Sequence, residues 1–177
     1  MPDKPARIQL CLVSHTNAGK TTLARTLLGA DVGEVRDAAH VTQTADAYRL
    51  LATADGDELY LWDTPGFGDS ARLAKRLEKA GNPVGWFLTE VWDRVSDRAF
   101  WLSQRALQAA RDNADVVLYL VNASEDPQDA GYVAPEMQIL QWLGKPVVVL
   151  LNQMGPPRPA AREQEDVSRW TNHLRPY

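Results

Sequence analysis

The sequence has few of the features that mark secreted, membrane-spanning or nucleic-acid-binding proteins. Its one cysteine, Cys11, excludes a disulfide within the chain and suits a reducing compartment. The longest apolar runs, residues 116–121 and 147–151, are far shorter than the roughly 20 residues that cross a bilayer. The 19 basic residues do not outnumber the 23 acidic ones, which disfavours electrostatic binding of nucleic acid. We therefore expect a cytoplasmic domain with no transmembrane segment and no nucleic-acid partner. Any membrane association would depend on a region outside this chain.

The remaining pattern is that of an ordinary globular domain. The 177 residues suffice for one domain with a sizeable core. Apolar runs alternate with helical periodicity, which predicts an α/β fold with helices on both faces of a mostly parallel sheet. The predicted strands are residues 7–13, 47–53, 58–63, 116–122 and 147–151. The predicted helices are residues 20–28, 70–80, 83–113 with a break near 96–97, 135–143 and 160–174.

A phosphate-binding loop follows the first predicted strand. Residues 14–21 read SHTNAGKT, which matches the P-loop pattern G-x-x-x-x-G-K-[ST] except that Ser14 replaces the first glycine. In such a loop, main-chain N–H groups face a phosphate. Lys20 supplies a charge to the β- and γ-phosphates, and the Thr21 hydroxyl is suited to ligate Mg²⁺. The simpler alternative is a chance Gly-Lys-Thr turn that opens a helix.

The predicted nucleotide-binding residues of this loop lie in one continuous stretch. They are His15, Thr16, Asn17, Ala18, Gly19, Lys20, Thr21 and Thr22. For His15, a contact with phosphate or base and a purely structural role in the loop both stay open. A first loop position that needs a positive φ would strain Ser14, because a serine, unlike glycine, has a Cβ.

A second motif ends the third predicted strand, where the sequence reads Asp63-Thr64-Pro65-Gly66. An aspartate at a strand end near a P-loop is the Walker-B arrangement, which holds Mg²⁺, usually through water. The N–H of Gly66 is suited to contact the γ-phosphate, a contact that is lost on hydrolysis. The alternative is an ordinary Pro-Gly turn after a strand.

Together these motifs resemble those of the TrmE–Era–Septin-like branch of the translation-factor-class GTPases. The chain also resembles bacterial proteins in which such a domain precedes a long C-terminal region. The resemblance covers residues 7–155 and rests on residues 15–22, Gly33-Glu34-Val35, residues 63–66, Ala114-Asp115 and Asn152. It implies a P-loop NTPase three-layer sandwich that hydrolyses GTP to GDP as a molecular switch. Because domains of this family continue to a sixth strand, we expect residues 1–177 to be one GTPase domain that is shortened at its C-terminal end.

The resemblance implies further roles in and around the switch loops. It makes Lys20, Thr42 and Gly66 the catalytic set, with Thr42 closing over Mg²⁺ and the γ-phosphate in switch I. Thr44 is the second choice, and a solvated loop position is the alternative for either threonine. Phe67 stands where many GTPases carry a water-orienting glutamine. In potassium-stimulated relatives an asparagine at the position of Asn17 coordinates K⁺, which would stabilise the transition state; a bond to the loop backbone is the alternative.

The base site departs from the family pattern. Guanine-specific domains carry Asn-Lys-x-Asp after the fifth strand, whereas this chain has Asn152-Gln153-Met154-Gly155. Asn152 matches and Gln153 is able to cover the base, but Gly155 has no carboxylate for the guanine donors. Two other functions therefore stay open: a P-loop ATPase or kinase, and a nucleotide-binding interaction module with little turnover.

The resemblance places switch II at the motif of residues 63–66 and the residues after it, and the stretch that follows is rich in aromatic residues. It contains Trp86, Phe87, Trp92, Phe100 and Trp101. Packing into the domain core is one interpretation. The other is a helical insert that binds a protein partner in a nucleotide-dependent way, since aromatic clusters are common interface anchors.

Overall fold

A five-stranded sheet forms the centre of the domain. The structure, a computed structural model, describes residues 5–29, 45–79 and 97–177. The strands are β1 (Arg7–Ser14), β2 (Asp46–Ala52), β3 (Glu58–Asp63), β4 (Val116–Asn122) and β5 (Val147–Asn152). They lie in the order β2-β3-β1-β4-β5, and only β2 runs antiparallel to its neighbour. The predicted mostly parallel α/β sheet is confirmed.

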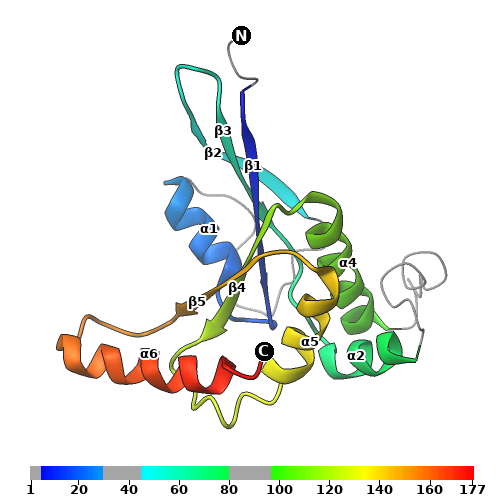
Figure 1. Cartoon of the computed structure of the whole chain (residues 1–177), viewed down its shortest axis with the longest axis vertical. Coiled ribbons are helices and arrows are strands. Elements are labelled where there is room, and N and C mark those ends of the chain that lie inside the picture. Colours follow the sequence, from blue (N-terminus) through cyan, green and yellow to red (C-terminus); the bar gives the residue numbers. More distant parts are fainter. Residues whose placement is uncertain (1–4, 30–44, 80–96) are drawn as a thin grey trace.

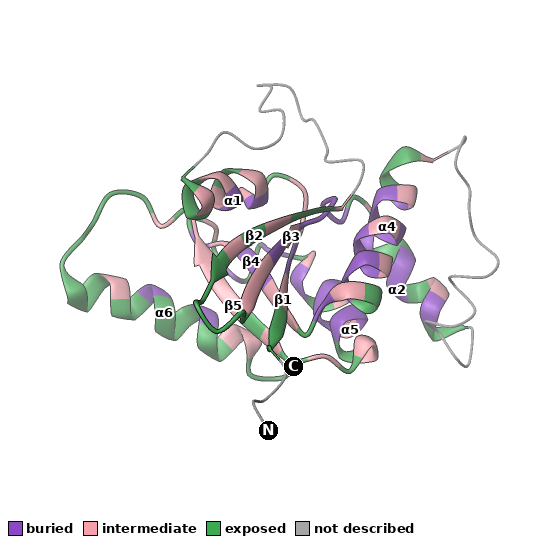
Figure 2. Ribbon diagram, turned by 90° about the horizontal axis from the view of Figure 1, so that it is seen from above, coloured by how far each residue is buried: buried purple, intermediate pink, exposed green. Residues whose placement is uncertain are grey.

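Helices cover both faces of this sheet (Figure 1). They are α1 (Lys20–Leu28), α2 (Ser70–Glu78), α4 (Arg98–Asn113), α5 (Val133–Leu143) and α6 (Ala160–Leu174). One face carries α1, and the other carries α2, α4 and α5. Figure 2 shows buried residues on the sides of α4 and α5 that face the strands. This arrangement is the three-layer sandwich expected from the sequence.

The strand β1 shows why the apolar runs of the sequence are continuous. Cys11 and Val13 belong to the apolar cluster beneath α2, α4 and α5, whereas Leu12 belongs to the cluster beneath α1. Successive side chains of a strand point to opposite faces, so a strand covered on both sides needs apolar residues throughout. All three residues are fully buried.

Two helix boundaries refine the sequence-based prediction. Helix α4 begins at Arg98, where the Asp97 side chain caps it by accepting the N–H of Phe100 at 3.2 Å. This start lies next to the predicted break near residues 96–97. The helix predicted from residue 83 lies outside the described residues, so the break itself stays a prediction. Helix α5 begins at Val133, two residues before the predicted start at Pro135. Proline is tolerated in a first helical turn because the N–H it lacks has no partner there anyway.

The two ends of the sheet carry different connections. At one end, β2 and β3 are joined by an exposed turn over residues 53–57, in which the Gly56 N–H donates to the Thr53 carbonyl. At the carboxyl ends of β1 and β3 lie the predicted site residues. In the part of the chain that the structure describes, β5 is the last strand and α6 comes after it. Among these residues no helix is long and apolar enough to cross a bilayer.

Candidate nucleotide-binding site

The phosphate-binding loop connects the carboxyl end of β1 to the N-terminus of α1. Asn17 and Gly19 have positive φ values of 67° and 89°. Ser14 lies at the end of β1 and is not in the left-handed region. The strain that a positive φ would impose on Ser14 therefore does not arise, because the left-handed residues lie three and five positions further along. The φ of Gly19 favours glycine, and a Cβ there would lie 2.7 Å from Asn152 Nδ2 and displace that side chain.

The lysine of the loop is buried against the serine that departs from the pattern. Lys20 is 7% exposed, and its Nζ donates to Ser14 Oγ at 2.7 Å. The same hydroxyl donates to the His15 carbonyl at 2.6 Å. Burial lowers the pKa of Lys20 to about 8. An ammonium group held in this way is suited to receive an anion.

A part-buried pair of oxygen-bearing side chains, Thr21 and Asp63, lies beside Lys20 and fits a magnesium ion. Thr21 Oγ1 donates to Asp63 Oδ2 at 2.7 Å. Asp63 is 3% exposed, its Oδ1 has no hydrogen-bond partner among the described residues, and burial raises its pKa. A carboxylate and a hydroxyl are ligands that Mg²⁺ accepts together with water and phosphate oxygens. In the described residues no cluster of three or more His, Cys, Asp or Glu side chains could hold a metal ion. A metal here would therefore depend on the nucleotide for further ligands.

The predicted switch II segment, which follows Asp63, pairs with the phosphate-binding loop at Phe67. The Phe67 N–H donates to the Ser14 carbonyl at 2.9 Å, and the Phe67 carbonyl accepts from the N–H and the hydroxyl of Thr16. A Cβ on Gly66 would lie 2.9 Å from Thr16 Cα and 3.2 Å from Lys20 Nζ. Gly66 is thus a close approach that only glycine allows. The Phe67 side chain is fully buried and turned away from solvent.

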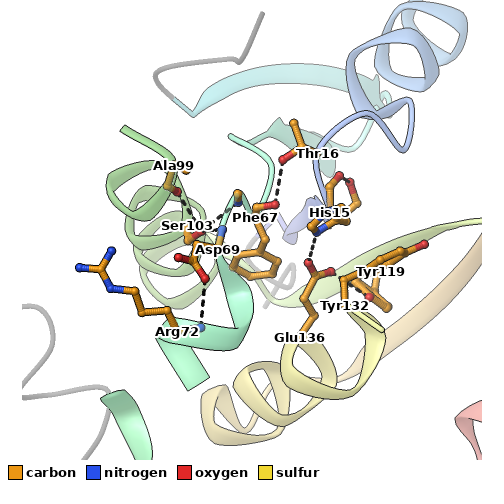
Figure 3. Close-up of polar contacts among 12 residues, drawn as sticks. His15, Thr16, Phe67, Asp69, Arg72, Ala99, Ser103, Tyr119, Tyr132 and Glu136 are labelled. Atoms are coloured by element: carbon orange, nitrogen blue, oxygen red, sulfur yellow. Dashed lines mark hydrogen bonds and ion pairs between the residues drawn. The ribbon is translucent and has the colours of Figure 1, made fainter. Parts of the chain in front are cut away.

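A serine of α4 holds the next two residues of switch II (Figure 3). The N–H groups of Gly68 and Asp69 donate to Ser103 Oγ at 2.9 and 3.1 Å. Ser103 Oγ in turn donates to the Ala99 carbonyl at 3.1 Å. Sequence reasoning missed Ser103, because a serine inside a helix carries no local sign of a distant partner.

The end of β5 and the residue that follows it contact the other side of the loop. Asn152 Nδ2 donates to the Ala18 carbonyl at 2.8 Å, and Gln153 Nε2 donates to the Asn17 carbonyl at 3.3 Å. Both predicted base-site residues therefore lie against the loop. A Cβ on Gly155 would meet no atom within 4 Å, although the φ of this residue is +79°. The position of the missing carboxylate is open space.

His15 turns away from the loop toward α5. Its Nδ1 lies 2.8 Å from Glu136 Oε1, and its ring stacks on Tyr132. The structural role left open for His15 is thus observed for its side chain, while its contact with nucleotide stays a prediction. Nothing in the sequence pattern marked Glu136. Thr22 is exposed in the first turn of α1.

Several predicted residues lie outside the described ranges. They are Thr42, Thr44, the stretch 33–35, Trp86, Phe87 and Trp92. Their roles in closing over the nucleotide or binding a protein partner stay predictions. Phe100 is fully buried in the main apolar cluster, so the core interpretation is confirmed for this aromatic residue.

The site combines a strand, a lysine-bearing loop at the start of a helix, and an aspartate at the end of the neighbouring strand. These three features define the class of P-loop nucleotide-binding domains. Residues 9–153 match the family described as 50S ribosome-binding GTPase. The chain belongs to this GTPase family.

Individual relatives of this chain are GTPases as well. GTPase Der of Dinoroseobacter shibae is 35% identical over 79 residues, which cover 45% of this chain and 16% of Der. GTPase Der of Listeria welshimeri is 24% identical over 173 residues, which cover 95% of this chain and 32% of Der. The chain thus spans a third or less of the length of these curated relatives.

Solved structures share the fold. Era of Aquifex aeolicus bound to GDP·AlF4⁻ superposes with a TM-score of 0.67 at 19% identity, covering 96% of this chain and 48% of Era. Era in complex with MgGDPNP and a segment of 16S ribosomal RNA superposes with a TM-score of 0.64 at 19% identity, covering 97% and 49%. At this identity the likeness shows the fold alone.

Proposed function

We propose that this chain is a GTPase domain that binds GTP with Mg²⁺ and hydrolyses it to GDP and phosphate as a molecular switch. The observation that carries the proposal is the buried Lys20 ammonium group, held at the loop beside the Thr21–Asp63 pair. Family membership supports GTP as the nucleotide. Era, which has the same fold, was solved with MgGDPNP.

In the proposed reaction, the loop N–H groups and Lys20 hold the phosphates while water attacks the γ-phosphorus in line. The bond from the γ-phosphorus to the bridging oxygen breaks, and inorganic phosphate leaves GDP in the site. A bound Mg²⁺, held by Thr21 and Asp63 with Thr42, would neutralise developing negative charge. The proposed sensors of the γ-phosphate are Thr42 and Gly66, and loss of the γ-phosphate would release switch II.

Stabilisation of the transition state needs a group other than a glutamine after Gly66. Phe67 is buried and has no side-chain group that hydrogen-bonds water. We propose that Asn17, exposed in the loop, coordinates K⁺ beside the phosphates. Phosphate release is then faster in KCl than in NaCl, and Asn17→Gly abolishes the difference. Glycine is the better replacement here, because φ is +67° and alanine would add strain. Equal rates in both salts would remove K⁺ from the proposal.

The base preference has its own test. Gly155 in place of a carboxylate favours a second candidate, a P-loop ATPase or kinase. Competition of unlabelled GTP and ATP against a labelled GTP analogue separates the two, since the GTPase assignment requires GTP to compete at far lower concentration. Equal competition by ATP supports the second candidate. Tight GTP binding without phosphate release identifies a binding module with little turnover.

A further inference from the structure

Glu136 is a buried carboxylate that the proposed reaction does not use. It lies in the first turn of α5 and is fully buried. Its Oε2 accepts the Tyr119 hydroxyl at 2.9 Å, and its Oε1 lies 2.8 Å from His15 Nδ1 (Figure 3). Burial of a carboxyl group costs free energy unless its oxygens are hydrogen-bonded. Here each oxygen has one partner, and one of the two partners belongs to the phosphate-binding loop.

His15 joins Glu136 to the rest of the nucleotide site. Its ring stacks on Tyr132, with 4.4 Å between ring centroids and 15° between ring planes. Tyr132 is the residue immediately before α5, so both side-chain contacts of His15 come from one helix end. The backbone of His15 pairs with Phe67 at the start of switch II, and its carbonyl accepts from the Ser14 hydroxyl. His15 is thus held between α5, switch II and the serine that contacts Lys20.

The four residues between Ser14 and Gly19 are restrained from three directions. The Asn17 and Ala18 carbonyls accept from the end of β5 and the residue after it, and Thr16 donates to Phe67. The contact from α5 restrains His15 alone. Loop N–H groups that already converge need less reordering to bind a phosphate. Loss of the α5 contact would leave His15, the first residue after β1, without a side-chain contact to any other described residue.

The hydrogen bond between His15 and Glu136 forms whether Glu136 is ionised or protonated. With Glu136 ionised, His15 Nδ1–H donates to it, and with Glu136 protonated, the carboxyl group donates to Nδ1. Burial raises the pKa of Glu136, while the hydrogen bond from His15 acts in the opposite direction. In both protonation states His15 Nδ1 and Glu136 Oε1 stay hydrogen-bonded.

We propose that Glu136 is a positioning residue for nucleotide binding, which acts through His15 to hold the phosphate-binding loop in its binding conformation. The proposal rests on the proposed function, since it requires a nucleotide at this loop. The pair is not expected to touch the reacting atoms. Its loss should raise the rate of nucleotide dissociation rather than alter the chemistry.

The chain offers a matched set of variants. His15→Phe keeps a ring to stack on Tyr132 and removes the nitrogen that faces Glu136. His15→Asn loses the stack but keeps an N–H donor near the position of Nδ1. Tyr119→Phe removes the other hydrogen bond of Glu136 without touching the loop. Glu136→Gln keeps the size of the side chain and one oxygen.

The experiment measures the dissociation constant and the dissociation rate of a fluorescent GDP analogue with Mg²⁺, together with the nucleotide-free unfolding temperature. We expect about tenfold weaker binding for His15→Phe, mainly through faster dissociation, as for the loss of one hydrogen bond to a charged group. His15→Asn should stay within about threefold of the parent chain, and Glu136→Gln should lie between these two variants. Tyr119→Phe should lower the unfolding temperature and leave the dissociation constant within about twofold.

Two results would overturn the inference. One is a folded His15→Phe variant that binds as tightly as the parent chain. The other is a Tyr119→Phe variant that loses as much affinity as His15→Phe, because the effect would then follow stability and not the loop contact. Lys20→Ala distinguishes a failure of the proposed function from a failure of the inference about Glu136. If the parent chain and Lys20→Ala both fail to bind, the proposed function and the inference fall together. Unchanged binding across the His15 and Glu136 variants would remove the inference alone.

Discussion

Nucleotide affinity should fall as the pH rises from 7.5 to 9, because Lys20 then loses its proton. Burial lowers the pKa of Lys20 to about 8 in the nucleotide-free protein, and the Asp63 and Glu136 carboxylates only partly oppose this effect. A bound phosphate favours the ammonium form and raises this pKa. Above pH 8, nucleotide binding is therefore accompanied by protonation of Lys20, and the affinity decreases as the pH rises.

The size of the effect can be calculated from these pKa values. With a free pKa near 8 and a bound pKa above about 10, the dissociation constant should increase roughly eightfold between pH 7.5 and 9. Over the same pH range the stability of the nucleotide-free protein changes in the opposite direction from the nucleotide affinity, because it rises with pH. The folded pKa of Lys20 lies below the ordinary value of 10.5, so between pH 8 and 9 the nucleotide-free protein should gain about 1 kcal/mol of unfolding free energy from this group.

Titration with a fluorescent GDP analogue at each pH measures the first effect, and urea unfolding measures the second. The control is Lys20→Arg, whose guanidinium group stays charged throughout this range. Whatever affinity this variant retains should not fall with pH. A flat dissociation constant for the parent chain, or an equal decline in Lys20→Arg, would refute the assignment of the pH dependence to Lys20.

Three further predictions concern the residues around the loop. Gly66→Ala should weaken GTP-analogue binding by about tenfold more than GDP binding in a competition assay, since the added Cβ meets Thr16; equal losses would contradict this. Asp63→Asn should remove most of the Mg²⁺ dependence of nucleotide binding, measured by EDTA titration, and an unchanged dependence would exclude Asp63 as a metal-binding residue. Ser103→Ala should cost about 1–3 kcal/mol of unfolding free energy in urea, because two N–H groups of switch II lose their acceptor; no change would show that water replaces it.

The strands and helices were largely predictable because their signals are local. Continuous apolar runs specify strands that are buried on both faces, as β1 and β4 are. The start of α4 was predictable to within a residue or two as well, although the capping contact of Asp97 became visible only in the structure. The predicted start of α5 lies two residues late, because a proline is tolerated at more than one position of the first turn and Pro135 does not occupy the first of them.

The residues of the site also fall into two groups: some were predictable from nearby sequence, and others depend on contacts between residues far apart in the chain. Lys20, Thr21 and Asp63 are predictable from motif spacing, and the structure brings them together. Glu136 and Ser103 are not. Glu136 is 121 residues from its partner His15, and only the packing of α5 against the sheet brings them within 2.8 Å. A pattern of neighbouring residues holds no information about such a pair.

Ser14 escapes strain for a physical reason. Strain would require a positive φ at this first loop position, as its usual glycine suggests. In the structure this residue still belongs to β1, and its hydroxyl serves as the acceptor for Lys20. The substitution therefore adds a hydrogen bond to the loop instead of a distortion.

The turn between β2 and β3 offers an attachment point for a spectroscopic reporter. Residues 53–57 are exposed and lie at the opposite end of the sheet from the phosphate-binding loop (Figure 1). Asp55 precedes Gly56, and neither belongs to the nucleotide site. An Asp55→Cys variant would carry the one solvent-accessible thiol of the described residues, since Cys11 is fully buried and burial raises its thiol pKa to about 12. A dye on that thiol would report the tumbling of the domain from a position away from the proposed nucleotide site.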